Sequence, residues 1–270
     1  LIAHFQALDA AAPYSSRRIA CDLDPAQVIA HAERLGIVEQ IPHPFGNLVR
    51  VVDAQVQQLP YFRNNVLHLF AVPALIACLV GNNRSLDVQR LTDAVVGIYG
   101  VMRSALFMRW TEAELLHEIQ HTIVFAERGL LRRAERSGWL LAPETNSQEF
   151  PELHMIGETL RPMLGRHFLA LALLQQRGSG KLTRAVLEKD CQSLAQRLAL
   201  LHGFGEAETA DRSDFANLVS NLLDGELLVE DEEGLLRFDQ RLLGPLTHVE
   251  LVLSADARQS IRRVAEQPSA

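Results

Sequence analysis

The chain has 270 residues, of which 48% are hydrophobic and 22% are charged, and its formal net charge is −7. This composition is typical of a folded globular protein and excludes a disordered chain. Because phosphate contacts dominate nucleic-acid affinity, the negative net charge argues against a protein that binds nucleic acids in general. Three widely spaced cysteines, Cys21, Cys78 and Cys191, offer neither a disulfide framework nor a thiolate zinc site.

Helical periodicity and helix start signals dominate the chain, so helices are expected along most of its length. Asp24 followed by Pro25 is typical of a helix start, and Thr111 with Glu114 forms a capping box. Ser85 is the expected N-cap of the fourth helix. The expected helices cover residues 1–12, 25–35, 54–80, 86–110, 112–129, 148–176, 183–202, 213–224 and 256–266.

Prolines and a long apolar run qualify the third of these helices. Interruptions are expected near Pro60 and Pro73, because proline lacks the N–H that a helix interior needs. The apolar run 66–80 is shorter than the roughly 20 residues that span a bilayer, and it contains His68. It is therefore interpreted as a buried helix kinked at Pro73. Neither a transmembrane helix nor a signal peptide is expected.

Short apolar runs separated by turn residues predict three small hairpins, within residues 36–53, 129–143 and 225–238. The second and third each follow a helix. This repeated helix-then-hairpin pattern resembles the end of a winged-helix unit. The predicted fold is therefore mainly α, a multi-helix domain with small β-hairpins and two winged-helix-like units.

Residues 117–121 read HEIQH, which matches the H-E-x-x-H pattern of zinc hydrolases. On a helical wheel His117 and His121 share one face, about 160° from the centre of the apolar stripe. A catalytic zinc also needs a third protein ligand, for which Glu144 or Glu149 stays open. The motif is interpreted as the solvated side of an amphipathic helix. No metal and no other cofactor is expected.

Two shorter matches have equally plain interpretations. His4 and Asp9 have the spacing H-x4-D, in which an aspartate orients a histidine base, but so short a pattern recurs by chance. The sequence GSGK at residues 178–181 resembles the end of a phosphate-binding loop. However, Gln175 occupies the position of the first glycine and Leu182 that of the magnesium-binding hydroxyl. This stretch is interpreted as a helix connector.

The densest unusual chemistry lies at the start of the third helix, where Arg63, Asn64, Asn65 and His68 interrupt an apolar pattern. In the plainer interpretation, these groups tie the helix start to neighbouring backbone, since buried polar groups are normally satisfied within the protein. In the sharper interpretation, Arg63 faces an anion or a carboxylate of another domain. The four residues are the candidate interface or anion contact.

The second hairpin combines Arg132, Arg133 and Arg136 with Trp139. Basic charge beside an amphipathic aromatic residue is typical of surfaces that contact anionic lipid. These four residues are the candidate membrane contact. The alternative is a hairpin that is simply solvated.

Three segments together resemble a known family: YFRNNVLHLFAVPALIACLV (61–80), IYGVMRSALFMRWTEAEL (98–115) and LEKDCQSLAQRLALLHG (187–203). In content and order they are similar to the C-terminal region of the bacterial membrane-bound glycerol-3-phosphate 1-O-acyltransferases. The resemblance extends from about Asp53 to the end of the chain. It implies a parent enzyme that moves an acyl chain from acyl-CoA or acyl-carrier protein to the sn-1 hydroxyl of glycerol 3-phosphate, at the first step of phospholipid biosynthesis.

The resemblance also implies where catalysis takes place. In the family a His–Asp pair in H-x4-D deprotonates the hydroxyl, and arginines in later motifs, including F-P-E-G-x-R, hold the phosphate. His4 and Asp9 have no such block behind them, and FPELH at 150–154 lacks its glycine and arginine. The catalytic block is therefore expected upstream. This chain is therefore expected to contain no catalytic residue and to be inactive by itself.

The expected organisation follows from this resemblance. Residues 1–53 form a linker or small α+β segment after the catalytic domain, 54–147 a helical region with the first helix–hairpin unit, and 148–270 a helical region with the second. The partners are the upstream acyltransferase domain and a membrane surface. The expected location is the cytoplasmic face of the inner membrane, as a peripheral protein. The alternatives are a winged-helix-like interaction or DNA-binding module and, third, a zinc hydrolase.

Overall fold

A computed structural model describes residues 23–56, 58–103, 105–106, 108–127, 129–134, 138–202 and 212–253, with isolated positions nearer the ends. The chain divides into two compact units, residues 1–70 and 71–270. The division falls inside a helix, and the expected boundaries at residues 53 and 147 stay predictions. The expected helices at 1–12 and 256–266 lie mostly outside the described residues.

The first unit begins with helix α2 (Pro25–Arg34), which starts at the predicted signal. The carboxylate of Asp24 accepts a hydrogen bond from the N–H of Ala26, and Gln27 completes the capping box by accepting from the N–H of Asp24. Strands β1 (Val38–Ile41) and β2 (Leu48–Val51) form the predicted antiparallel hairpin. A short 3-10 helix, η1 (Asp53–Gln55), leads toward the next helix.

Helix α3 (Leu59–Asn83) runs across the division between the units without a break. The interruption expected at Pro73 is therefore wrong, whereas the one expected near Pro60 is confirmed, because η1 ends at Gln55 and α3 begins only at Leu59. Pro60 stands in the first turn, where a missing N–H costs nothing, and the helix continues past Pro73 because residues 71–80 are all buried. By length and hydropathy, 65–83 could cross a membrane, but 67% of that stretch is buried, as in a core helix. The absence of a transmembrane helix stays a prediction.

The second unit continues with β3 (Ser85–Asp87), α4 (Val88–Met102), α5 (Glu112–Ala126), β4 (Arg132–Arg133) and β5 (Trp139–Leu141). The strands form an antiparallel sheet in the order β3-β5-β4. The prediction that Ser85 caps a helix beginning at Leu86 is wrong. Leu86 is buried in β3 opposite Leu140, and the cap is Asp87, whose carboxylate accepts from two backbone N–H groups. Pairing with a distant strand decides this conformation.

The single helix expected over 148–176 is two helices, α6 (Glu149–Glu158) and α7 (Arg161–Arg177). The cause is Pro162, which has no N–H to bond the carbonyl four residues earlier and whose ring would clash with it, so that it fits only the first turn of a new helix. The following elements are α8 (Arg184–His202), α9 (Arg212–Asp224), β6 (Val229–Glu230), β7 (Leu236–Arg237), α10 (Gln240–Leu243) and α11 (Leu246–Leu251).

The helix-then-hairpin pattern occurs twice in the second unit, as predicted. In each case, backbone that precedes the two helices pairs with the last strand of the hairpin. In the first, β3 pairs with β5, and in the second, Thr183 forms a single bridge with Leu235 beside β7. The structure is thus mainly helical with small antiparallel strand pairs, and the assignment to the winged-helix class stays a prediction.

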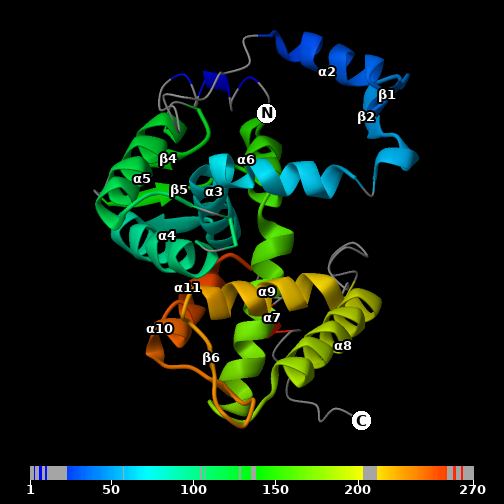
Figure 1. Ribbon diagram of the computed structural model, residues 1–270. Coiled ribbons are helices and arrows are strands. Elements are labelled where there is room, and N and C mark those ends of the chain that lie inside the picture. The colour runs from blue at the N-terminus through cyan, green and yellow to red at the C-terminus, as the bar shows by residue number, and fades with distance from the viewer. Residues whose placement is uncertain are drawn as a thin grey trace. The chain divides into compact units, whose positions relative to one another are not determined.

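The core of the second unit lies where α7 contacts α6, α8, α9 and α11, and where α11 contacts α4 (Figure 1). Phe168 on α7 and Phe215 on α9 are among the largest fully buried side chains. The side-chain amides of Asn82 and Asn83, at the end of α3, donate hydrogen bonds to the carbonyls of Val252 and Leu251. These bonds connect α3 to the end of α11.

Candidate functional site

The start of α3 carries the predicted interface residues. Asn65 is exposed, whereas Arg63 and His68 are half-buried, and the side chain of Asn64 lies outside the description. At about 100° per residue, Asn64, Asn65 and His68 fall on one side of the helix and Arg63 on another. Their role as an interface or anion contact stays a prediction.

The predicted membrane contact lies on the hairpin β4–β5. Trp139 is 47% exposed. Each described arginine faces a carboxylate: Arg132 Nη2 lies 3.5 Å from Glu144 Oε1, and Arg133 Nε lies 2.6 Å from Glu127 Oε1. These pairs balance the positive charge that would attract anionic lipid. Arg136 lies outside the described residues.

The HEIQH stretch lies on α5, which begins at the predicted capping box. The N–H of Thr111 donates to a carboxylate oxygen of Glu114 at 2.8 Å. His117 is exposed, but His121 is half-buried and its Nδ1 is shielded from solvent, so only one of the two histidines is on the solvated side. Within the described part of the chain, no group of three or more His, Cys, Asp or Glu side chains is placed to hold a metal ion. His4 and Asp9 lie outside it.

Glu118, which would be the general base of a zinc hydrolase, has a different role here. Burial raises the pKa of its carboxyl group above the ordinary value, and a hydrogen bond from Thr122 partly opposes this effect. Thr122 is buried one turn further along α5. The carboxylate is thus bound to its own helix.

The GSGK connector is fastened to the second hairpin. The Ser179 hydroxyl donates to the carbonyl of Phe238 and accepts from its N–H, and the N–H of Gly180 donates to Leu236 at 2.8 Å. Gly180 has a φ of +71°, and a Cβ there would lie 2.8 Å from the guanidinium of Arg237. The backbone donor that a phosphate would need is therefore used by β7, and the interpretation as a connector is confirmed.

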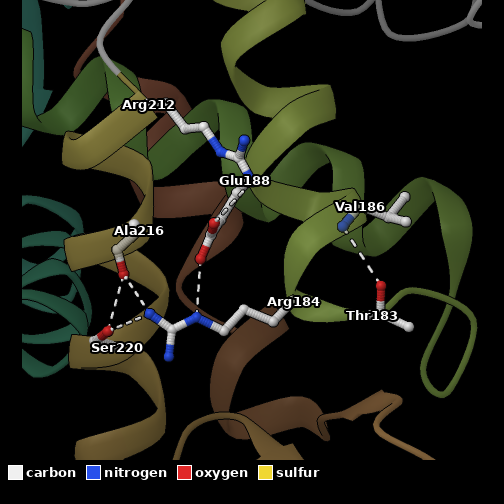
Figure 2. A network of polar contacts seen from close by, with 7 residues as sticks. All are labelled: Thr183, Arg184, Val186, Glu188, Arg212, Ala216 and Ser220. Carbon is white, nitrogen blue, oxygen red and sulfur yellow. Dashed lines mark hydrogen bonds and ion pairs between the residues drawn. The ribbon is translucent and has the colours of Figure 1, made fainter.

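A polar network that the sequence did not reveal lies between α8 and α9 (Figure 2). Its centre is Glu188, which is 7% exposed. Arg184 Nε donates to Glu188 Oε1 at 2.8 Å, and Arg212 Nη2 lies 3.9 Å from Glu188 Oε2. Arg184 also donates through Nη2 to the Ser220 hydroxyl at 2.7 Å and to the carbonyl of Ala216 at 3.2 Å. One guanidinium thereby joins the two helices.

The network borders an open pocket of about 460 Å³. The pocket is lined by Thr183, Arg184, Ala185, Glu188, Glu230 and Gly234. The guanidinium of Arg184, which lines the pocket, already binds the carboxylate of Glu188 and groups on α9. A role in helix packing therefore accounts for the network better than a role in ligand binding. The only sequence signal for it was the spacing of Arg184 and Glu188, which is that of a helical ion pair.

Burial shifts the pKa values of Cys78, Cys191 and His167 so that their neutral forms are favoured near neutral pH. Burial raises the pKa of the Cys78 thiol to about 12 and also raises the pKa of Cys191. Burial lowers the pKa of His167 to about 4, and its Nδ1–H donates to the carbonyl of Met163 at 2.9 Å. These groups contribute to packing.

Comparison with known proteins identifies the family. The family model of the glycerol-3-phosphate acyltransferase C-terminal region matches residues 1–231. The glycerol-3-phosphate acyltransferase of Xylella fastidiosa (strain M12) is 33% identical over 258 residues, which are 94% of this chain and 30% of that protein. Proteins of the same name from Xanthomonas campestris pv. campestris and Pseudomonas aeruginosa (strain UCBPP-PA14) are also 33% identical, over 94% and 95% of this chain and 29% and 31% of their own lengths.

The chain thus spans less than a third of the length of these relatives. The match includes the three segments on which the resemblance rested, and it begins well before Asp53, where the resemblance had been expected to start. The first compact unit therefore lies within the match. The chain belongs to the family of the glycerol-3-phosphate acyltransferase C-terminal region.

Proposed function

We propose that this chain is the helical region that supports the catalytic domain of a glycerol-3-phosphate acyltransferase, and that it performs no acyl transfer itself. The observation that carries the proposal is the match of residues 1–231 to the C-terminal region of that family, in relatives of which the chain covers about 30%. The parent enzyme would transfer an acyl chain from acyl-CoA or acyl-carrier protein to glycerol 3-phosphate. The product would be lysophosphatidate.

The chemistry of the described residues supports a structural role. Of the buried ionisable groups that the structure describes, Glu188 accepts a hydrogen bond from Arg184 on its own helix, and His167 donates to the carbonyl of Met163. The buried thiols have raised pKa values and are poor nucleophiles. The catalytic base would come from the upstream domain, in which the family resemblance places the His–Asp pair, and the nucleophile would be the hydroxyl of glycerol 3-phosphate.

The proposal is tested with the full-length gene product, the same protein lacking this region, and this chain alone. Labelled acyl-CoA and glycerol 3-phosphate are supplied, and lysophosphatidate is measured. We expect product from the full-length protein, a large loss without this region and none from the chain alone. Turnover by the chain alone would disprove a non-catalytic role. Full activity without the region would disprove its support of the catalytic domain. An inactive full-length protein would overturn the acyltransferase assignment.

We further propose that the parent is a peripheral protein of the cytoplasmic face of the inner membrane. The exposed Trp139 supports a contact with lipid, whereas the carboxylate partners of Arg132 and Arg133 weaken it. Alkaline carbonate should release a peripheral protein from membranes, and retention in the pellet would favour a spanning segment instead. A DNA-binding role is not favoured, because the relatives above are named acyltransferases.

A further inference from the structure

The described residues 23–56 of the first compact unit expose their large apolar side chains or bury them only in part. Among the described residues 23–56, no side chain is buried. Phe45, in the turn between β1 and β2, is 97% exposed. The other exposed large apolar side chains of this stretch are Leu23, Leu35, Ile41, Leu48, Val49 and Val56. A segment that buries so little gains almost none of the hydrophobic free energy that fixes a conformation, so this surface calls for a partner.

The hairpin tip, defined here as residues 41–49, contains no Asp, Glu, Lys or Arg. Behind it, Glu39 and Arg50 stand opposite each other in the strand register, and Arg50 Nε donates to Glu39 Oε1 at 2.7 Å. This pair neutralises the base of the hairpin. Ile41 and Leu48 stand opposite each other in the strand register and so share one face of the hairpin. Together with Phe45 in the turn they give the tip its exposed apolar side chains.

The charge around the hairpin tip distinguishes a protein partner from a lipid one. Between residues 24 and 53 there are four carboxylates and two guanidiniums, a net charge of −2. Anionic bilayers attract segments rich in lysine and arginine, and this segment has the opposite balance. An exposed phenylalanine among aliphatic side chains, bounded by a neutral ion pair, fits an apolar pocket on another protein surface.

We propose that the hairpin tip docks into an apolar site on the part of the parent polypeptide that precedes this region. The inference rests on the proposed function, because it takes the partner to be the upstream acyltransferase domain. The Xylella fastidiosa relative matches over 30% of its length, so 70% of that protein lies outside the match and can supply the partner. Covalent linkage gives the contact a high effective concentration, so a small apolar contact is sufficient.

The test is site-specific photo-crosslinking in the full-length protein. Phe45→p-benzoylphenylalanine places a photoreactive ketone at the hairpin tip, and the crosslinked peptides are identified by mass spectrometry. We expect a crosslink within one polypeptide, to a peptide upstream of Leu1. Crosslinks to lipid, to a second copy or to residues 1–270, or no crosslink at all, would each overturn the proposal.

The matched control is Val229→p-benzoylphenylalanine, in β6 of the second hairpin unit, where the native side chain is 56% exposed. No upstream crosslink is expected from that position. In a third protein, the photoreactive residue replaces Leu48 and Phe45→Asp is added. Burying a phenylalanine changes an equilibrium constant on the order of tenfold or more. The upstream crosslink from position 48 should therefore be about tenfold weaker with Asp at position 45 than with the native Phe45. An unchanged yield would show that Phe45 does not dock.

Acyltransferase activity of the unmodified protein is measured in the same preparation. An active protein without the upstream crosslink overturns the docking surface and leaves the proposed function standing. An inactive protein with the crosslink overturns the proposed activity and leaves the docking contact standing.

Discussion

Arg184 and Glu188 lie one turn apart on α8, and the guanidinium Nε donates a 2.8 Å hydrogen bond to a carboxylate that is 7% exposed. The two partners are not equivalent, because 39% of the arginine side chain is exposed. If its partner is lost, Arg184 can turn toward water, whereas Glu188 would stay buried. The same guanidinium holds Ser220 and the carbonyl of Ala216 on α9.

This asymmetry predicts that removing the arginine costs more than neutralising the glutamate. Arg184→Met should lower the free energy of unfolding by about 3 kcal/mol, since it leaves a buried carboxylate with Arg212 only at 3.9 Å. Glu188→Gln should cost about 1 kcal/mol, because an amide still accepts a hydrogen bond. Urea unfolding of both variants measures the difference.

The double variant Arg184→Met with Glu188→Met provides the control. Replacing both charges with apolar groups removes the uncompensated carboxylate, so much of the stability lost in Arg184→Met should return. Two results would contradict a buried Glu188 that depends on Arg184. One is an equal loss in the free energy of unfolding for the two single variants, and the other is a double variant less stable than Arg184→Met.

Elements whose signals are local in sequence were predicted well. The caps at Asp24 and Thr111 and the three hairpins depend on residues a few positions apart, and each lies where the pattern indicates. Strand β3 could not be predicted in this way, because it has three residues and pairs with a strand more than fifty residues away. Its helix-like sequence is overridden by the burial of Leu86 against Leu140.

Contacts between distant residues were beyond reach for the same reason. Arg184 with Glu188 was visible as a spacing, but nothing near it in sequence indicates Arg212 or Ser220. A helical wheel describes one helix alone and ignores its neighbours. It therefore could not show that His121, on the predicted solvated face of α5, is half-buried. The break before α7 could have been predicted from Pro162, because a proline removes a hydrogen bond from a helix interior and fits only the first turn of a helix.

Gly157 on α6 should tolerate no side chain, because α3 passes close to it. A Cβ there would lie 3.1 Å from Cys78 Sγ and 3.3 Å from Cys78 N, and the thiol donates to the carbonyl of Gly157. Gly157→Ala should destabilise the protein by about 1–3 kcal/mol, the cost of overpacking. Thermal or urea unfolding measures it.

Gly165→Ala on α7 is the matched control. A Cβ at Gly165 meets nothing within 4 Å, so the higher helix propensity of alanine should raise stability by up to about 1 kcal/mol. Similar effects from the two substitutions would show that packing between α3 and α6 does not limit position 157.

The thiols of Cys78 and Cys191 should resist alkylation in the folded protein. Both are buried, and burial raises both pKa values, that of Cys78 to about 12, so neither forms much thiolate near neutral pH. N-ethylmaleimide is added at pH 7.5 with and without urea, and adducts are mapped by mass spectrometry. Labelling of either residue at the same rate in both conditions would contradict its burial.

The stability of the protein should fall as pH decreases below neutrality because of His167. Burial is the largest cause that lowers its pKa to about 4, nearby Arg166 lowers it further, and the hydrogen bond to Met163 opposes both. Since the folded pKa lies below the ordinary value of 6.5, the unfolded chain takes up the proton first as pH falls. The contribution is therefore complete above about pH 6.5 and is lost progressively toward pH 4, by up to about 3 kcal/mol in total.

The measurement is the free energy of unfolding in urea at several pH values between 7 and 4, for the native protein and His167→Gln. Glutamine can donate to the carbonyl of Met163 but does not titrate, so the variant should be less stable at pH 7 and lose less stability on acidification. Carboxyl groups that titrate in the same range are common to both proteins and cancel in the difference between the two curves. Parallel curves from pH 6.5 to 4 would mean that His167 is protonated in the folded protein or does not lie in the core.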